Sequence, residues 1–399
     1  MLKEISIEDL KPGMLINKVF TSDKSIDLLF RNFHAKNQED VQRLKKSGIT
    51  RVIIDLTQQP VPEPDTHAET SLNAKKRFTN LKQDIKVAEK VFNESKTAIE
   101  NFYNNTHSDE IAINDLAPVL DKTFESIREN NYALLTILHM HRNSDKFLSH
   151  IFSVLSIVTA IGHRMHFDGN NLFSLGLSAL LHDIGWSRLP TYLPEKSGNY
   201  TEKELKLARQ HAHYGLSIIE KIKELPQNVI DILKEYYIYE ESHHLPPSHD
   251  DTVYANMGKL ITIVDIYDSL THGIKGNNQR TPYAALQLMY KQAQEGDIDT
   301  AILTQLIKLL GVYPVSSAVE LASGERGVVI ELNKEHPLKP IVKICYDANK
   351  TPISGDLIID LSSEEFDSKR KIKGVIDPLM FGVDPYNLLK LDAALQETE

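Results

Sequence analysis

Histidine and aspartate residues stand on the apolar faces of separate helical segments in the middle of this 399-residue chain. His150 lies in the segment 146–164, where Val154, Ile157 and Ile161 follow it at helical spacing, so the imidazole shares their face. A single histidine on such a face is more commonly a hydrogen-bonded core residue than a metal ligand. Whether His150 marks a site therefore depends on the other segments.

Two further segments add carboxylates to this pattern. His182 and Asp183 fall on the apolar face of the segment 172–186, and Asp265 falls on that of the segment 257–270. A buried carboxylate needs a partner, yet no Lys or Arg stands three or four residues from either aspartate. Imidazole nitrogens together with carboxylate oxygens suit Zn, Mn and Fe. We therefore expect a metal site where these inward faces meet, with a charged partner from another helix as the alternative.

More histidines extend the predicted set of ligands. His211 lies on the apolar face of the segment 202–222, and the adjacent pair His243 and His244 precedes a Pro-Pro turn. Both imidazoles of the pair can reach one cation if the helix is distorted at its end. The alternative interpretation of the pair is a polar helix terminus, and the pair alone does not separate the two.

Composition restricts the function and the compartment. The net charge of −10 and the pI of about 5.9 argue against binding to a nucleic-acid polymer, which requires a basic surface. With one cysteine, Cys345, no intrachain disulfide can form, which fits a reducing compartment. The first ten residues lack the apolar core of a signal peptide, and the apolar run 151–162 is too short to cross a bilayer. We expect a cytoplasmic, soluble protein.

The patterning predicts a mainly α fold with β structure near both ends. Strand-like runs occupy 14–20, 51–56, 328–330, 341–345 and 357–359, and a short helix is predicted over 38–47. The expected units are a small α+β N-terminal module (1–56), a Pro-rich linker (57–72), a helical connector (73–141), a helical domain (142–315) and a β-rich C-terminal extension (316–399). The module and the connector are predicted to regulate or dimerise the helical domain, or to support it structurally.

The order of these residues and the strings around them resemble the HD-GYP family of bacterial cyclic di-GMP phosphodiesterases, within the HD phosphohydrolase superfamily. The strings LLHDIG (180–185), HAHYG (211–215) and VDIYDSLT (264–271) are similar to three motifs of that family. The C-terminal part and, more weakly, the N-terminal module also resemble regions that accompany it. The resemblance implies an all-helical HD domain with a binuclear metal site, in which a metal pair polarises the phosphoryl group and activates water.

The resemblance also assigns roles to residues and to metals. Two divalent ions are implied, with Fe or Mn favoured and Zn, Ni or Mg as alternatives, and His182 and Asp183 are the implied catalytic residues. The first ion would be held by His150, His182, Asp183 and Asp265, and the second by His211, His243 and His244, with Asp183 bridging.

The chain departs from the family at several positions. Trp186 stands where the family has a lysine that contacts phosphate, and the loop 243–251 lacks the GYP sequence. Lys146 stands where members with a third metal have a glutamate, so we expect two ions. Asp268, Arg280 and Trp186 are the candidates for contact with substrate.

Three functions follow from these observations. The first is a metal-dependent phosphodiesterase that acts on cyclic di-GMP or a related cyclic dinucleotide in signal transduction. The second is a catalytically weak or inactive receptor for such a ligand, or a protein-interaction module, because Trp186 and the altered loop remove ligand-contacting groups. The third is an HD hydrolase for another phosphorylated nucleotide. A homodimer or a signalling partner protein fits any of them.

Overall fold

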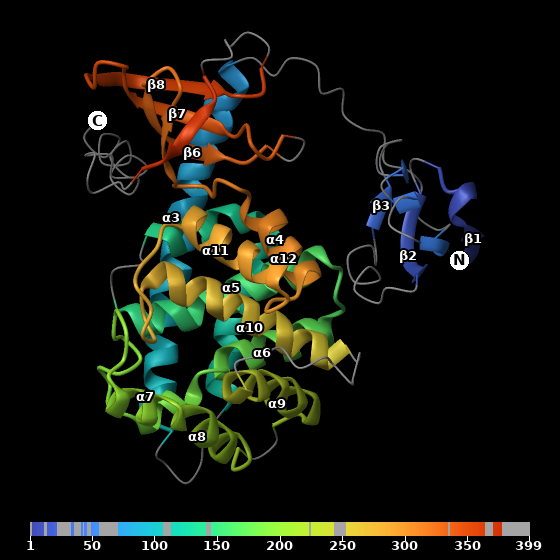
Figure 1. Ribbon diagram of the computed structural model, residues 1–399, viewed down its shortest axis with the longest axis vertical. Helices are drawn as coiled ribbons and strands as arrows, with labels where there is room; N and C mark the ends of the chain where they lie inside the picture. Colours follow the sequence, from blue (N-terminus) through green and yellow to red (C-terminus); the bar gives the residue numbers. More distant parts are fainter. Residues whose placement is uncertain are drawn as a thin grey trace.

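A helical body with a β-sheet near each end of the chain makes up this computed structural model (Figure 1), as the mainly α prediction required. The described residues are 2–11, 14–21, 33–35, 41–42, 44–45, 49–55, 71–106, 113–140, 145–222, 225–242, 253–333, 336–363 and 370–376.

The helical body runs from residue 71 to residue 310. Its α-helices are α3 (Ser71–Asn104), α4 (Ala117–Met140), α5 (Lys146–Arg164), α6 (Gly169–Leu181), α7 (Glu202–Ala208), α8 (Gln210–Ile219), α9 (Gln227–Ser242), α10 (Val253–His272), α11 (Pro282–Glu295) and α12 (Thr300–Leu310). Two 3₁₀ helices, η2 (Ile113–Leu116) and η3 (Ile184–Arg188), lie between them.

Helix α5 is the central helix of this body, because α3, α4, α6, α10 and α12 all contact it. Its residues from Ser149 to Gly162 are buried, as expected for a helix that is apolar on nearly every side. It is long and apolar enough to cross a membrane by composition, but 78% of its apolar window is buried among the other helices. Its position therefore indicates a core helix.

The segment predicted as one helix over 172–186 ends earlier than expected. Asp168 caps the start of α6 by accepting a hydrogen bond from the Asn171 amide at 2.8 Å, and the helix ends at Leu181. The chain then turns into η3, where the backbone packs against α8. A Cβ atom on Gly185 would lie 1.9 Å from the carbonyl oxygen of His211. Close packing of two backbones, which only glycine permits, thus redirects the chain directly after His182.

The other helical predictions agree with the structure to differing degrees. The segments 146–164 and 257–270 correspond to α5 and α10. The segment 202–222, predicted as one helix, is divided at Arg209 into α7 and α8, and α7 begins with a capping box between Thr201 and Glu204.

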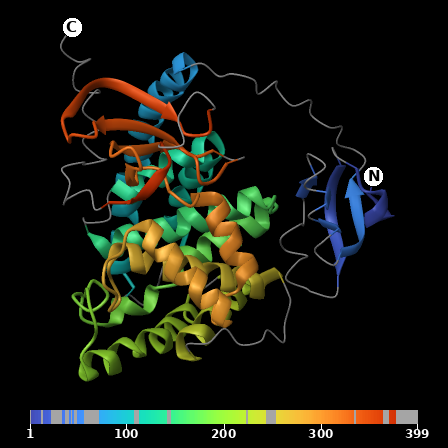
Figure 2. The same ribbon diagram turned by 45° about the horizontal axis from the view of Figure 1, so that its top comes forward.

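The C-terminal sheet packs one face against the helical body. Its strands β5 (Ala318–Leu321), β6 (Arg326–Glu331), β7 (Ile341–Tyr346), β8 (Pro352–Asp360) and β9 (Ile372–Val375) are ordered β8-β7-β6-β5-β9, with antiparallel pairing. Because side chains alternate along a strand, Ile330 and Ile341 join the helical core while Val329 and Val342 form a second core. Figures 1 and 2 show this sheet beside α3, which contacts β8.

The N-terminal strands form an antiparallel sheet with a core of its own. They are β1 (Leu2–Ser6), β2 (Met14–Thr21), β3 (Phe33–Ala35) and β4 (Ile49–Asp55), in the order β1-β4-β2-β3. Ile16, Val52 and Ile54 are buried in that core. Of the predicted helix 38–47, the described residues 41–42 and 44–45 are helical, whereas the predicted linker lies mostly outside the described residues. The domain boundaries stay predictions.

We expect Gly185→Ala to lower the free energy of unfolding by about 2 kcal/mol or more, because the added methyl group would force η3 away from α8. Gly169→Ala is the matched control, since nothing lies within 4 Å of the position of its Cβ atom. Denaturant unfolding of both variants measures the difference. Equal stability of the two variants would contradict this account of the turn.

Candidate metal centre

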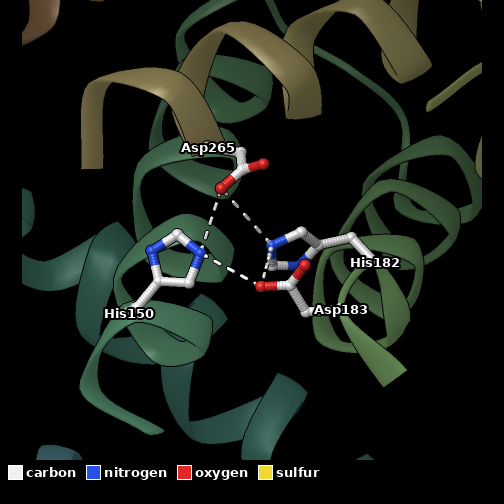
Figure 3. Close-up of side chains that lie close together, drawn as sticks. All are labelled: His150, His182, Asp183 and Asp265. Atoms are coloured by element: carbon white, nitrogen blue, oxygen red, sulfur yellow. Dashed lines mark ion pairs between the residues drawn. The ribbon is translucent and has the colours of Figure 1, made fainter. Parts of the chain in front are cut away.

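Three helices bring four ligand-type side chains to one buried point (Figure 3). His150 comes from the middle of α5, His182 and Asp183 from the end of α6, and Asp265 from α10. One ligand atom from each side chain lies within 4.8 Å of all the others, and none of the four residues is more than 4% exposed. We call these four residues the His/Asp cluster. The sequence predicted their meeting, and the structure brings them together.

The distances inside the His/Asp cluster match ligands around a shared cation. The Nε2 atom of His150 lies 3.1 Å from Oδ1 of Asp265 and 3.3 Å from Oδ2 of Asp183, and Nε2 of His182 lies 3.3 Å from that same Oδ2. Charge-assisted hydrogen bonds are shorter, at about 2.7 to 2.9 Å. Atoms that each lie about 2.1 Å from one cation are separated by about 3.0 to 3.5 Å.

The imidazole nitrogens that face the centre of the cluster support the same conclusion. Nε2 of His150 and Nε2 of His182 are buried and make no hydrogen bond to any residue that the structure describes. Buried nitrogens without a hydrogen bond are costly, and a cation between them would satisfy both. The residues present therefore fit a divalent metal ion with nitrogen and oxygen ligands.

The opposite side of each imidazole ring is held by an acceptor. Nδ1 of His150 lies 2.7 Å from Oδ2 of Asp268, and Nδ1 of His182 lies 2.7 Å from the carbonyl oxygen of Ala179. An acceptor at Nδ1 keeps the proton on that nitrogen and directs the Nε2 lone pair toward a metal. Both histidines are therefore oriented as metal ligands.

Asp268 lies behind His150, away from the centre of the cluster. It is 2% exposed, accepts a hydrogen bond from the hydroxyl of Ser153, and lies 2.9 Å from Nδ1 of His272. The sequence suggested Asp268 for contact with substrate, but these contacts give its carboxylate a positioning role toward His150. His272 is itself buried.

Lys275 is a part of the centre that the sequence analysis did not identify. Its Nζ atom lies 2.6 Å from Oδ2 of Asp183 and 2.7 Å from Oδ1 of Asp265, and its side chain is 10% exposed. Lys275 belongs to the segment 273–278 after α10. The apolar residues of this segment follow neither helical nor strand spacing, so the sequence did not indicate that the lysine side chain points into the protein. A positive charge thus contacts both carboxylates of the His/Asp cluster.

The pKa values in the centre follow from this concentration of charge. Burial raises the pKa of Asp183, but the charges of His182 and Lys275 outweigh it and hold the pKa well below its usual value. Burial likewise opposes ionisation of Asp265, yet Lys275 and His150 lower its pKa. Burial and Lys275 lower the pKa of His150, and its contacts with Asp183, Asp265 and Asp268 reverse this and raise it to about 10. Without a metal, the centre is therefore an array of charged groups.

His211 and Trp186 form the wall on one side of the cluster. The two rings stack with centroids 4.5 Å apart at 12°, and the indole Nε1 donates a hydrogen bond to Oδ1 of Asp183 at 3.1 Å. Nε2 of His211 lies 3.3 Å from Oε2 of Glu240, a residue that sequence reasoning missed. The other two residues predicted for the second metal, His243 and His244, lie outside the described residues.

Tyr236 on α9 contacts both carboxylates of the His/Asp cluster, whereas Arg280 after α10 has no described contact with it. The hydroxyl of Tyr236 donates a hydrogen bond to Oδ2 of Asp265 at 2.9 Å, and a longer one of 3.4 Å to Oδ1 of Asp183. This tyrosine lies on an apolar helix face, where a residue that touches the site looks the same as a core residue. Arg280, predicted to contact substrate, is exposed, and no described contact joins its side chain to the cluster.

Family models match three parts of the chain. Residues 2–113 match a domain of unknown function (DUF3391), residues 132–302 match an HD domain, and residues 318–376 match a KOW domain associated with HD domains. The cyclic di-GMP phosphodiesterase PA4108 of Pseudomonas aeruginosa is 23% identical over 370 residues, which cover 90% of this chain and 89% of that protein. A solved structure, Bd1817, an HDG"Y"P protein from Bdellovibrio bacteriovorus, covers 78% of this chain and 99% of its own, with a TM-score of 0.42 and 15% identity.

The helical fold and the His/Asp cluster define an HD domain. The match to an HD domain and the similarity to this phosphodiesterase fit the resemblance to the HD-GYP family, from which the chain departs in having Trp186 after the HDIG sequence and in lacking the GYP sequence.

We expect Asp268→Ala to weaken metal binding by about 10- to 100-fold, because His150 would lose the acceptor that fixes its orientation. His163→Ala is the matched control, since His163 is an exposed histidine on the same helix. Competition with a chelator for Mn²⁺ or Zn²⁺ measures both affinities. Unchanged affinity in the Asp268 variant would show that this contact does not orient the ligand.

Proposed function

We propose that this chain is a metal-dependent phosphodiesterase that hydrolyses cyclic di-GMP or a related cyclic dinucleotide. The observation that carries the proposal is the buried His/Asp cluster, in which two imidazole nitrogens face a common point with no hydrogen-bond partner among the described residues. Such a site has no evident structural purpose without a cation, because unpaired buried nitrogens lower the stability of a fold.

The ligand set suits a divalent ion, with Fe or Mn favoured and Zn, Ni or Mg as alternatives. When bound, the ion would supply Lewis acidity to a phosphoryl oxygen and make water more acidic. His150, His182, Asp183 and Asp265 would hold it, while Asp268 keeps His150 in place. We assign the catalytic role to His182 and Asp183, and Arg280 stays a candidate for contact with the anionic substrate.

The class of substrate is supported by the curated relative. PA4108 is a cyclic di-GMP phosphodiesterase, and its similarity extends over nearly the whole of both chains. The acidic net charge of this chain is compatible with a small anionic ligand, because the metal centre supplies positive charge locally.

A second ion, held by His211, His243 and His244 with Asp183 bridging, is part of the proposal drawn from the family resemblance. Its support in the described residues is the position of His211, which lies beside the cluster with Nε2 toward Glu240.

A receptor that binds the cyclic dinucleotide without turnover is the second candidate. It is favoured by Trp186, which is 3% exposed and stacks on His211, in the position where the family has a cationic contact to phosphate. With an indole at this position, the site keeps the residues that would bind the metal but lacks the lysine that contacts phosphate in the family.

Turnover separates the two candidates. The purified chain, reconstituted with Mn²⁺ or Fe²⁺, is expected to convert cyclic di-GMP into a linear dinucleotide or GMP, detected by chromatography. His182→Ala is expected to abolish both metal binding and turnover, because it removes a ligand at the centre of the cluster. His213→Ala, which removes an exposed histidine, is the control and is expected to retain both.

Two results would overturn these assignments. Metal content together with binding of cyclic di-GMP, but no product at any metal loading, would replace the phosphodiesterase with the receptor. Full metal content in the His182 variant would show that the His/Asp cluster is not the metal centre.

A further inference from the structure

His211, at the start of α8, has its imidazole held in the same way as His182 in the His/Asp cluster. Its Nδ1 atom lies 2.6 Å from the carbonyl oxygen of Ala208, just as Nδ1 of His182 lies 2.7 Å from the carbonyl oxygen of Ala179. An acceptor at Nδ1 keeps the proton on that nitrogen and leaves the lone pair on Nε2. The fold thus presents His211 in the form in which an imidazole binds a metal.

The Nε2 atom of His211 faces a carboxylate without forming a hydrogen bond to it. The residue is 6% exposed, and Nε2 makes no hydrogen bond to any residue that the structure describes. Oε2 of Glu240 lies 3.3 Å away, the same distance that separates Nε2 of His182 from Oδ2 of Asp183. A charge-assisted hydrogen bond is shorter, at about 2.7 to 2.9 Å. A cation between the two atoms would satisfy the nitrogen and the carboxylate together.

The carboxylate of Glu240 is available for a cation. Among the described residues, it forms an ion pair with His211 and with no Lys or Arg. Its charge also acts on the centre: burial lowers the pKa of Lys275, but Asp183, Asp265 and Glu240 outweigh burial and raise it. A third carboxylate therefore adds to the negative charge of the two in the His/Asp cluster.

Helix α9 carries Glu240 to the edge of the cluster. Tyr236 lies one turn earlier on the same face of this helix, and its hydroxyl donates a hydrogen bond to Oδ2 of Asp265 at 2.9 Å. The helix that contacts a ligand of the first ion thus places Glu240 opposite His211.

Trp186 connects His211 to the cluster from the other side. Its indole stacks on the imidazole of His211, and its Nε1 atom donates a hydrogen bond to Oδ1 of Asp183 at 3.1 Å. One residue therefore contacts both His211 and the aspartate that the resemblance assigns to both ions.

We propose that Glu240 is a ligand of the second divalent ion, which binds between its carboxylate and Nε2 of His211. This ligand rests on the second ion of the proposed function, and it is a carboxylate that the family resemblance does not assign. Both side chains belong to the described residues, whereas His243 and His244 lie outside them. Nitrogen and carboxylate oxygen together suit Fe, Mn or Zn, as in the His/Asp cluster.

The number of ions bound by the full chain is the first test. After loading with Mn²⁺ or Zn²⁺ and removal of free metal, elemental analysis is expected to give two equivalents. Glu240→Gln, which keeps the size of the side chain and removes its charge, is expected to hold one. His211→Ala and the double variant are also expected to hold one, because both residues would bind the same cation. Glu220→Gln, which changes an exposed carboxylate directly after α8, is the matched control and is expected to hold two.

Competition with a chelator measures the affinity for the second ion. Removal of a residue that only supports a ligand costs about 10- to 100-fold in affinity, so removal of a ligand in Glu240→Gln is expected to cost about 100-fold or more. The first equivalent is expected to stay bound. Glu240→Asp retains the charge on a shorter side chain and is expected to weaken the second ion less than Glu240→Gln does. If the glutamine variant does not fold, the aspartate variant decides the question, and unchanged affinity in it then contradicts the assignment.

A plain ion pair between His211 and Glu240 would give a different result. Glu240→Gln would then hold two equivalents with unchanged affinity, and this outcome overturns the inference, as does a single equivalent in the wild type. Two equivalents that fall to one in Glu240→Gln, without turnover of cyclic di-GMP by the wild type, would support the ligand and remove the phosphodiesterase. No bound metal at all would remove the metal centre on which both depend.

Discussion

The burial of two carboxylates, those of Asp183 and Asp265, is the constraint on which this arrangement depends. Neither residue is more than 4% exposed, and an ionised carboxylate in a protein interior costs several kcal/mol unless opposite charge and hydrogen bonds compensate it. The chain supplies two imidazoles from α5 and α6 and the ammonium of Lys275. The helices that carry these groups must therefore pack so that the charges meet, and the apolar core around α5 holds them in that packing.

The end of α6 is the local feature that makes the ligand pair His182 and Asp183 usable. In a continuous helix, consecutive side chains point about 100° apart, so one of the pair would face away from the cluster. Because the chain turns into η3 after the helix, Oδ2 of Asp183 comes within 3.3 Å of Nε2 of His182, and both face Asp265. Gly185 permits this turn by lying against the backbone of α8. The short HDIG sequence thus encodes both the ligands and the bend that aims them.

The physical origin of each contact explains how far the sequence could predict the site. His150 and the three other cluster residues were identifiable because a carboxylate on an apolar stripe is anomalous and needs a cation. The position where α6 ends could not be predicted from the sequence, because it depends on packing between segments that are far apart along the chain. Tyr236 follows Val229 and Leu233 on the inward face of α9, a pattern that any core aromatic residue shows. Lys275 stands in a glycine-bounded segment without periodicity, so only the fold reveals where its side chain lies.

Lys275 also changes what a metal ion would mean for the stability of this protein. In a centre whose carboxylates lack any other cation, metal binding and folding are coupled, because removal of the ion leaves buried charges uncompensated. Here the ammonium compensates Asp183 and Asp265 in the metal-free chain, and His150 is held by Asp268 on its other side. The fold therefore does not need the ion for charge balance.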